Sequence, residues 1–93
     1  MTRQENIESA LQAAFHPERL FVINESHLHA GHRPPEEEGP ETHMRVRIVS
    51  AAFEGMGRVA RHRAINDALN AEFKDGLHAL AVEAAAPGEP TRW

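Results

Sequence analysis

The sequence predicts a small α+β domain, a two-layer α-β-β-α-β sandwich in which a three-stranded mixed sheet carries helices on one face. Two stretches, residues 2–15 and 58–74, repeat apolar side chains at three- and four-residue steps, as amphipathic helices do. Three shorter stretches, residues 19–26, 42–51 and 77–84, alternate in polarity or are rich in β-branched residues, as strands are. The 93 residues form one domain, because this length leaves no room for a second core.

The first helix is expected over residues 2–15. Its apolar stripe consists of Ile7, Leu11 and Phe15 with alanines between them. Thr2, followed three residues later by Glu5, predicts a capping box at the N-terminal end. The helix should end before Pro17, because the residue that precedes a proline avoids the helical conformation.

Two strands flank a long loop that is rich in histidine at its start and acidic at its end. Residues 19–26 form the first strand and residues 42–51 the second, and neighbours in sequence favour antiparallel pairing. Residues 27–41 contain three prolines and two glycines, so regular structure is excluded there. Long loops in compact domains are commonly functional or disordered.

A glycine-containing turn at residues 53–57 leads into the second helix, residues 58–74. Its apolar face should consist of Val59, His62, Ile65, Leu69 and Phe73. Asp75-Gly76 is typical of a helix C-cap, and residues 77–84 form the third strand. A right-handed crossover through the helix makes this strand parallel to the second. Residues 86–93 form a flexible tail, and its final residue, Trp93, either packs back or is exposed.

The composition of the chain restricts the classes of function that it can have. The net charge of −4 argues against non-specific nucleic-acid binding, although five arginines gather in residues 45–63. There are no cysteines, so a metal site here must use histidine, carboxylates or ligands from another molecule. No stretch is apolar enough to span a membrane, and we expect a cytoplasmic protein. No Ser-His-Asp or Cys-His arrangement is present, so we expect a protein that is not an enzyme.

Several motifs in one order give the chain a family resemblance. They are Asn24-Glu25-Ser26, Glu41-Thr42-His43, Phe53-Glu54-Gly55, Arg61-His62-Arg63 and His78-Ala79-Leu80. Together, on a predicted turn, helix and strand, they resemble the BolA family over about residues 5 to 90. The resemblance implies an α-β-β-α-β fold similar to a class II KH domain, with an element like a helix-turn-helix.

The resemblance also implies a partner and a cofactor. Such proteins pair with monothiol, CGFS-type glutaredoxins and share a [2Fe-2S] cluster with the glutaredoxin cysteine and glutathione. The histidine of the HAL motif, His78, is then one ligand. A loop histidine is the other: His29 is favoured, and His27 and His32 are the alternatives. Imidazole is a suitable iron ligand and raises the potential of such a cluster. The role that the resemblance implies is iron–sulfur trafficking or iron and stress regulation.

Other interpretations remain open. Arg58, Arg61 and Arg63 are candidates for binding DNA or a partner protein, as in a DNA-binding transcriptional regulator; otherwise they form a solvated helix face. His62 and His43 are expected to be packing residues. A lone zinc ion in the histidine loop is a third option, although zinc needs about four ligands. We expect a monomer or a weak homodimer when the protein is alone.

Overall fold

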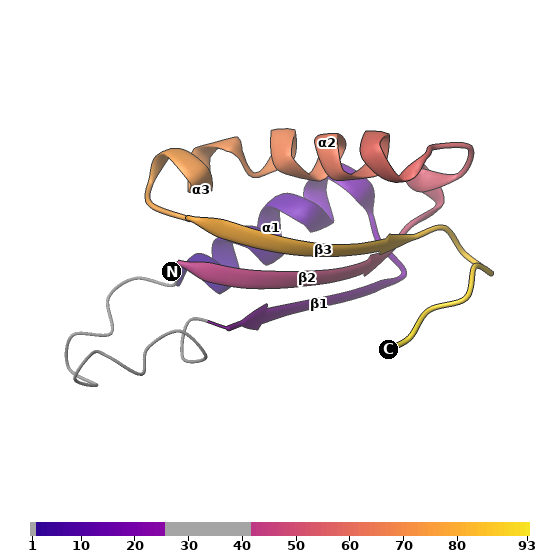
Figure 1. Ribbon diagram of the computed structural model, residues 1–93, viewed down its shortest axis with the longest axis horizontal. Helices are drawn as coiled ribbons and strands as arrows, with labels where there is room; N and C mark the ends of the chain where they lie inside the picture. Colours follow the sequence, from indigo (N-terminus) through magenta and orange to yellow (C-terminus); the bar gives the residue numbers. More distant parts are fainter. Residues whose placement is uncertain (1, 26–41) are drawn as a thin grey trace.

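The computed structural model describes residues 2–25 and 42–93 and confirms the predicted order of helices and strands. The elements are α1 (Arg3–Phe15), β1 (Arg19–Asn24), β2 (His43–Val49), the 3-10 helix η3 (Ala51–Phe53), α2 (Arg58–Ala68), α3 (Asn70–Lys74) and β3 (Ala79–Ala85). The helices lie on one face of the sheet, and the other face is uncovered by them (Figure 1). The fold is therefore the expected two-layer α+β sandwich.

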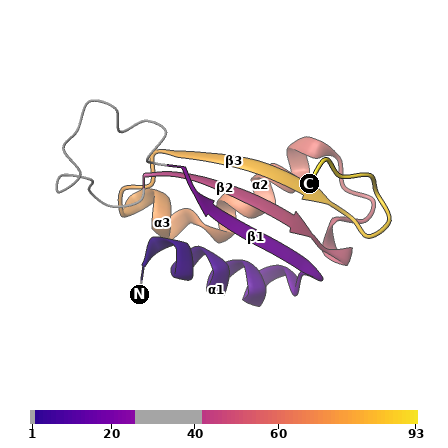
Figure 2. The ribbon, with the colours of Figure 1, turned by 90° about the horizontal axis from the view of Figure 1, so that it is seen from below.

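The sheet has the order β1-β2-β3. β1 pairs with β2 antiparallel, with Val22 opposite Val46, and β2 pairs with β3 parallel, with Val46 opposite Val82. The parallel pairing confirms the crossover expected from the sequence. Because β2 and β3 run the same way, their first residues lie at the same end of the sheet (Figure 2). Within the described part of the chain, β3 forms one edge of the sheet.

α1 begins as predicted. The Thr2 hydroxyl accepts a hydrogen bond from the Glu5 N–H, and the Glu5 carboxylate accepts one from the Thr2 N–H, which makes the capping box complete. Ile7 and Leu11 are fully buried against the sheet. The helix ends at His16, whose left-handed backbone (φ 43°) turns the chain toward β1.

The predicted helix over residues 58–74 is broken into α2 and α3 at Leu69. The backbone of Leu69 leaves helical geometry (φ −105°, ψ 15°), while its side chain stays fully buried beside that of Ile65. After this break, α3 packs against α1 and α2. The expectation that Val59 faces the core is wrong: its side chain is 64% exposed, because it lies about 120° around the helix from Ile65.

The turn between α3 and β3 is fixed from both sides. Gly76 has a left-handed backbone (φ 119°), and the Leu77 N–H donates back to the Glu72 carbonyl at 3.0 Å, so the predicted Asp75-Gly76 cap is confirmed. Across the fold, the buried Arg3 guanidinium donates to the carbonyls of Glu72 and Asp75 at 3.2 and 3.1 Å. It also forms ion pairs with both carboxylates. α1 therefore holds the turn that leads to β3.

The core lies between the helices and the sheet. Its largest fully buried side chain is Phe53, whose ring packs 5.0 Å from that of Phe15. Within the described residues, no helix combines the length and apolar character that a bilayer crossing needs. β3 begins at Ala79, two residues later than predicted, because the α3 cap includes Leu77. His78 is thereby placed at the junction of the cap and the strand.

Candidate functional site

His78 lies exposed at the end of the sheet where β3 begins. Its backbone N–H donates to the Thr42 carbonyl at 2.9 Å, and the next N–H, of Ala79, donates to the same carbonyl at 3.1 Å. The main chain at His78 is thus bound to the start of β2 while the side chain is open to solvent. An imidazole on a fixed backbone and with an exposed ring is suited to binding a metal that another molecule also holds.

His43, the first residue of β2, lies beside His78. The two ring centroids are 6.3 Å apart and the ring planes are inclined at 72°. The parallel register causes this contact, because it pairs His43 with Ala79, the residue after His78. The His43 Nδ1 is also 2.9 Å from the Thr42 hydroxyl, a contact that orients the ring. The sequence interpretation of His43 as a packing residue missed this pairing, because the register between β2 and β3 was not yet known.

The imidazole pair has the chemistry of half a metal site. A metal bound by a histidine nitrogen at 2.0–2.1 Å lies roughly 3.2 Å from the ring centre, so two rings separated by 6.3 Å are near the outer limit of sharing one ion. For the two rings to share one ion in a tetrahedral site, the exposed His78 side chain would have to rotate toward His43. Among residues 2–25 and 42–93, no three histidine or carboxylate side chains gather closely enough to hold a metal.

The favoured loop ligand, His29, and its alternatives His27 and His32 lie outside the described residues. Their role stays a prediction. The described residues on either side of them, Glu25 and Thr42, lie at the imidazole pair's end of the sheet, because β1 ends and β2 begins there. The Glu25 N–H, at the end of β1, donates to the His43 carbonyl at 2.8 Å.

Beyond His43, the uncovered sheet face carries a row of ion pairs. Arg45 donates to Glu25 at 2.7 Å and to Glu83 at 3.2 Å, and Arg47 donates to Glu83 at 2.8 Å. These hydrogen bonds, with that from Arg47 the strongest influence, lower the pKa of Glu83. The Glu25 carboxylate correspondingly raises the pKa of Arg45. The β2 arginines are therefore already neutralised by carboxylates of the same chain.

The three arginines proposed for DNA or partner binding do not act alike. Arg58 and Arg63 are exposed on α2. The side chain of Arg61 is only 12% exposed and turns inward, where it donates to the Met56 and Ala84 carbonyls at 2.9 and 3.4 Å. Arg61 therefore stabilises the fold through these contacts, whereas Arg58 and Arg63 are directed toward solvent.

Arg61 also holds the C-terminal tail. Its two terminal nitrogens donate to the two oxygens of Glu89 at 2.6 and 2.9 Å, and Glu89 accepts a further hydrogen bond from the Ala86 N–H. These bonds, that from Arg61 first, lower the pKa of Glu89 to about 2. Beyond this clamp the chain turns back, and Trp93 packs edge-on to Phe21 with ring centroids 6.0 Å apart. The alternative in which Trp93 packs back is therefore correct.

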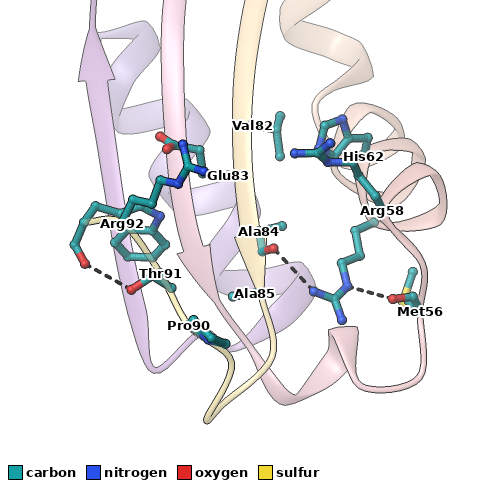
Figure 3. Close-up of a pocket in the computed structure, with 12 residues that line it drawn as sticks. Met56, Arg58, His62, Val82, Glu83, Ala84, Ala85, Pro90, Thr91 and Arg92 are labelled. Atoms are coloured by element: carbon teal, nitrogen blue, oxygen red, sulfur yellow. Dashed lines mark hydrogen bonds between the residues drawn. The ribbon is translucent and has the colours of Figure 1, made fainter.

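A pocket of about 420 Å³ lies between α2, β3 and the tail. Its walls include Arg58, His62, Val82, Arg92 and Trp93. His62 from α2 and Val82 from β3 project into the same space (Figure 3). His62 is half-buried there, as a packing residue would be, and it contributes to the pocket instead of the imidazole pair.

The fold and the site define a small α+β binding domain that presents paired imidazoles at one end of its sheet. The family model described as BolA-like protein matches residues 11–89. The chain belongs to the BolA family. The resemblance drawn from its motifs, and the α+β fold that it implied, are thus confirmed.

The chain is also similar to individual proteins and to a solved structure. A Sinorhizobium protein named "Uncharacterized protein in cobS 5'region" is 69% identical over the whole of both chains. The "DNA-binding transcriptional regulator BolA" of Haemophilus influenzae is 40% identical over 89 residues, which cover 96% of this chain and 82% of the relative. The chain spans 57% of mouse BolA-like protein 1, with 43% identity. The solved structure of BolA1 from Arabidopsis thaliana superposes with a TM-score of 0.88 at 37% identity and covers 98% of both chains.

Proposed function

We propose that this chain is a cytoplasmic adaptor that binds a monothiol glutaredoxin and supplies histidine ligands to a [2Fe-2S] cluster shared with the glutaredoxin cysteine and glutathione. It acts by binding, without catalysis of its own. The observation that carries the proposal is the exposed His78 ring with the His43 ring 6.3 Å away. Membership of the BolA family supports the choice of partner.

The residues present suit this cluster. The chain has no cysteine, so any thiolate ligands must come from other molecules. A cluster with imidazole on one iron and thiolate on the other has the ligand set of a mixed histidine–cysteine centre, and it has a higher potential than an all-thiolate one. His78 would be the first ligand. The second would be either a loop histidine or the adjacent His43. Among the loop histidines, His29 is preferred over His27 and His32.

The protein's own part is to hold the imidazoles in place. Arg3 fixes the α3 cap, and the Thr42 carbonyl fixes the backbone of His78, so that the ring rotates about a stationary main chain. The Thr42 hydroxyl orients His43. Contacts of this kind, which orient a ligand without touching the metal, commonly change metal affinity by about 10- to 100-fold when they are lost.

The test is reconstitution. The wild-type chain, a CGFS-type glutaredoxin, ferrous iron, sulfide and glutathione should yield a heterodimer whose visible circular dichroism differs from that of the glutaredoxin's own cluster. His78→Ala should abolish that difference. His16→Asn is the matched control, because His16 is exposed at the opposite end of the sheet. An unchanged spectrum in His78→Ala would reject His78 as a ligand.

The second ligand is identified in the same experiment. His43→Ala and His29→Ala are compared one at a time, with His27→Ala and His32→Ala as further single variants. The variant that changes the heterodimer spectrum as much as His78→Ala identifies the partner imidazole. If none of the four does so, the two-histidine form of the proposal is wrong while the role of His78 stands.

A second candidate function is DNA binding by α2. The exposed Arg58 and Arg63 favour it, and relatives in Haemophilus influenzae and Vibrio cholerae are named DNA-binding transcriptional regulators. Binding through phosphates should weaken steeply with salt, and losing one contact should reduce the slope of log K against log salt by about 0.9. Mobility shifts of duplex DNA should therefore weaken in Arg63→Glu. Absence of binding at low salt would remove this function.

A further inference from the structure

We propose that the free edge of β3, together with the pocket beneath α2, binds an extended acidic peptide segment of a partner protein as an added strand. The inference is independent of the cluster, because this surface is built by α2, β3 and the tail and does not include the imidazole pair. Three observations carry it: the edge of β3, to which no other strand of the described residues pairs, the pocket beside it, and the charge of the residues around both.

The direction of the β3 backbone groups follows from their hydrogen bonds. The Ala85 carbonyl accepts from Ser50, and the Ala79 N–H donates to Thr42, so both point toward β2. The Ala84 carbonyl accepts instead from the Arg61 side chain, on the opposite side. Because backbone groups alternate along a strand, those of Leu80 and Val82 point the same way as that of Ala84, toward the free edge.

This edge has few of the features by which proteins prevent unwanted pairing. Between Ala79 and Ala85 there is no proline and no lysine, and the only charged side chain, that of Glu83, is neutralised by Arg45 and Arg47 on the uncovered sheet face. Arg61 occupies the carbonyl of Ala84 and so ends the accessible stretch there. Leu80 and Val82 together present two donors and two acceptors, which is a length of edge that an added strand can use.

The pocket provides space for side chains next to that edge. Its volume is about 420 Å³, and Val82 from β3 and His62 from α2 line it from opposite sides (Figure 3). A strand added at β3 would direct alternate side chains toward it. The edge would then give the backbone hydrogen bonds and the pocket would select the side chains, which is the division of roles in β-strand addition.

Charge selects an acidic occupant. Two cations that line the pocket, Arg58 and Arg92, are exposed. His62, on α2, also lines the pocket. The other charged residues there have partners in the chain: Arg61 pairs with Glu89, and Glu83 pairs with Arg47. The surplus charge is therefore positive beside a strand edge on a chain whose net charge is −4.

The same features argue against two other occupants. A second copy paired through β3 would form an isologous interface and bring the same arginine-bearing patches together. A nucleic-acid strand offers phosphate oxygens, which only accept hydrogen bonds, so the outward carbonyls of Leu80 and Val82 would face acceptors. A peptide backbone alternates donors and acceptors as the edge does.

The test uses a defined probe, an eight-residue peptide of alternating glutamate and threonine, acetylated and amidated. In a nuclear magnetic resonance titration it should shift the amide signals of Leu80 and Val82 more than those of Ala81 and Glu83. A matched lysine–threonine peptide should bind at least tenfold more weakly. The same glutamate–threonine peptide N-methylated at every backbone nitrogen should not bind, because it then has no donor on either edge for the carbonyls of β3.

Two variants of the chain, and a third as their control, test which groups bind the peptide. Val82→Pro removes an N–H that points away from β2, a position at which an edge strand tolerates proline, and it should weaken peptide binding at least tenfold. Arg58→Glu should weaken it similarly, whereas Arg63→Glu, on the same helix but outside the pocket, should change it less than twofold. Should Val82→Pro fail to fold, the N-methylated peptide tests the same hydrogen bonds.

Other results would overturn the proposal. Equal binding of the lysine peptide, retained binding in Val82→Pro, or no binding at millimolar peptide would each reject it. Sedimentation that shows a homodimer lost in Val82→Pro would assign the edge to self-association. Shifts of the Leu80 and Val82 amides by a single-stranded oligonucleotide but not by the peptide would assign it to nucleic acid.

Discussion

The rings of His43 and His78 lie 6.3 Å apart at one end of the sheet, although 35 positions separate them in the chain. Each residue stands at or just before the start of its strand, and the parallel pairing of β2 with β3 brings those starts together. The contact therefore depends on the crossover through α2 and α3.

Replacing the proposed ligand with a thiolate should change the potential of the cluster. His78→Cys in the glutaredoxin heterodimer should retain a cluster but lower its reduction potential, because thiolate replaces imidazole on the iron. A redox titration followed by visible circular dichroism measures the shift. His16→Cys should leave the potential unchanged, and an unchanged potential in His78→Cys itself would contradict ligation by His78.

Arg3 should be important for stability. Its buried guanidinium pairs with Glu72, whose side chain is only 16% exposed, and it satisfies two carbonyls at the end of α3. Removing one member of a buried pair costs about 3–5 kcal/mol, so Arg3→Ala should lower the free energy of unfolding by about 3 kcal/mol. Urea denaturation measures it. Arg63→Ala, at an exposed position, should stay within about 0.5 kcal/mol of wild type, and an equally small loss in Arg3→Ala would show that the anchor is dispensable.

Gly76 should not tolerate a side chain. Its φ of 119° lies where L-residues are strained, although an added Cβ would meet the Arg3 guanidinium only at an ordinary contact distance of 3.5 Å. Gly76→Ala should therefore destabilise the fold by about 1–3 kcal/mol. Gly57→Ala is the control, because Gly57 has φ −75° and open space around it. Thermal unfolding compares the two, and equal melting temperatures would refute the strain argument.

The clamp between Arg61 and Glu89 should open in acid. The pKa of Glu89 is lowered to about 2 from 4.5, so its stabilising effect is complete above pH 4.5 and is lost as the pH falls toward 2. The Glu89 carboxyl carbon should titrate near pH 2 by nuclear magnetic resonance. Glu18, an exposed carboxylate on the approach to β1, serves as an internal comparison. A Glu89 midpoint near 4.5 would mean that the clamp does not form in solution.

Loss of that clamp should be visible at Trp93, the chain's one tryptophan. Its ring packs edge-on to Phe21 and beneath the Arg19 guanidinium, 4.9 Å from the ring centroid. Glu89→Gln should free the tail and shift the tryptophan emission to longer wavelength at neutral pH. Glu54→Gln, exposed in the turn before α2, should not. Identical spectra for both variants would show that Trp93 is held independently of Arg61.

Local patterns in the sequence were sufficient for the order of elements, the Thr2–Glu5 capping box and the Gly76 cap. Each depends on residues a few positions apart, whose hydrogen bonds form within one turn of chain. The break at Leu69 was not predictable in this way. An apolar residue with helical spacing fits one long helix or two short ones, and the packing of α3 against α1 and α2 is a contact between distant residues that the local pattern does not contain.

For the candidate site, sequence patterns alone predicted that His78 stands at the start of a strand in a cysteine-free chain that resembles the BolA family. The folded structure was needed to show that His43 is its neighbour, that Arg61 turns inward to Ala84 and Glu89, and that β3 is an edge strand among residues 2–25 and 42–93. The physical reason is that strand register and side-chain direction are set by contacts between residues far apart in the chain. A pattern of neighbours along the chain does not contain that information.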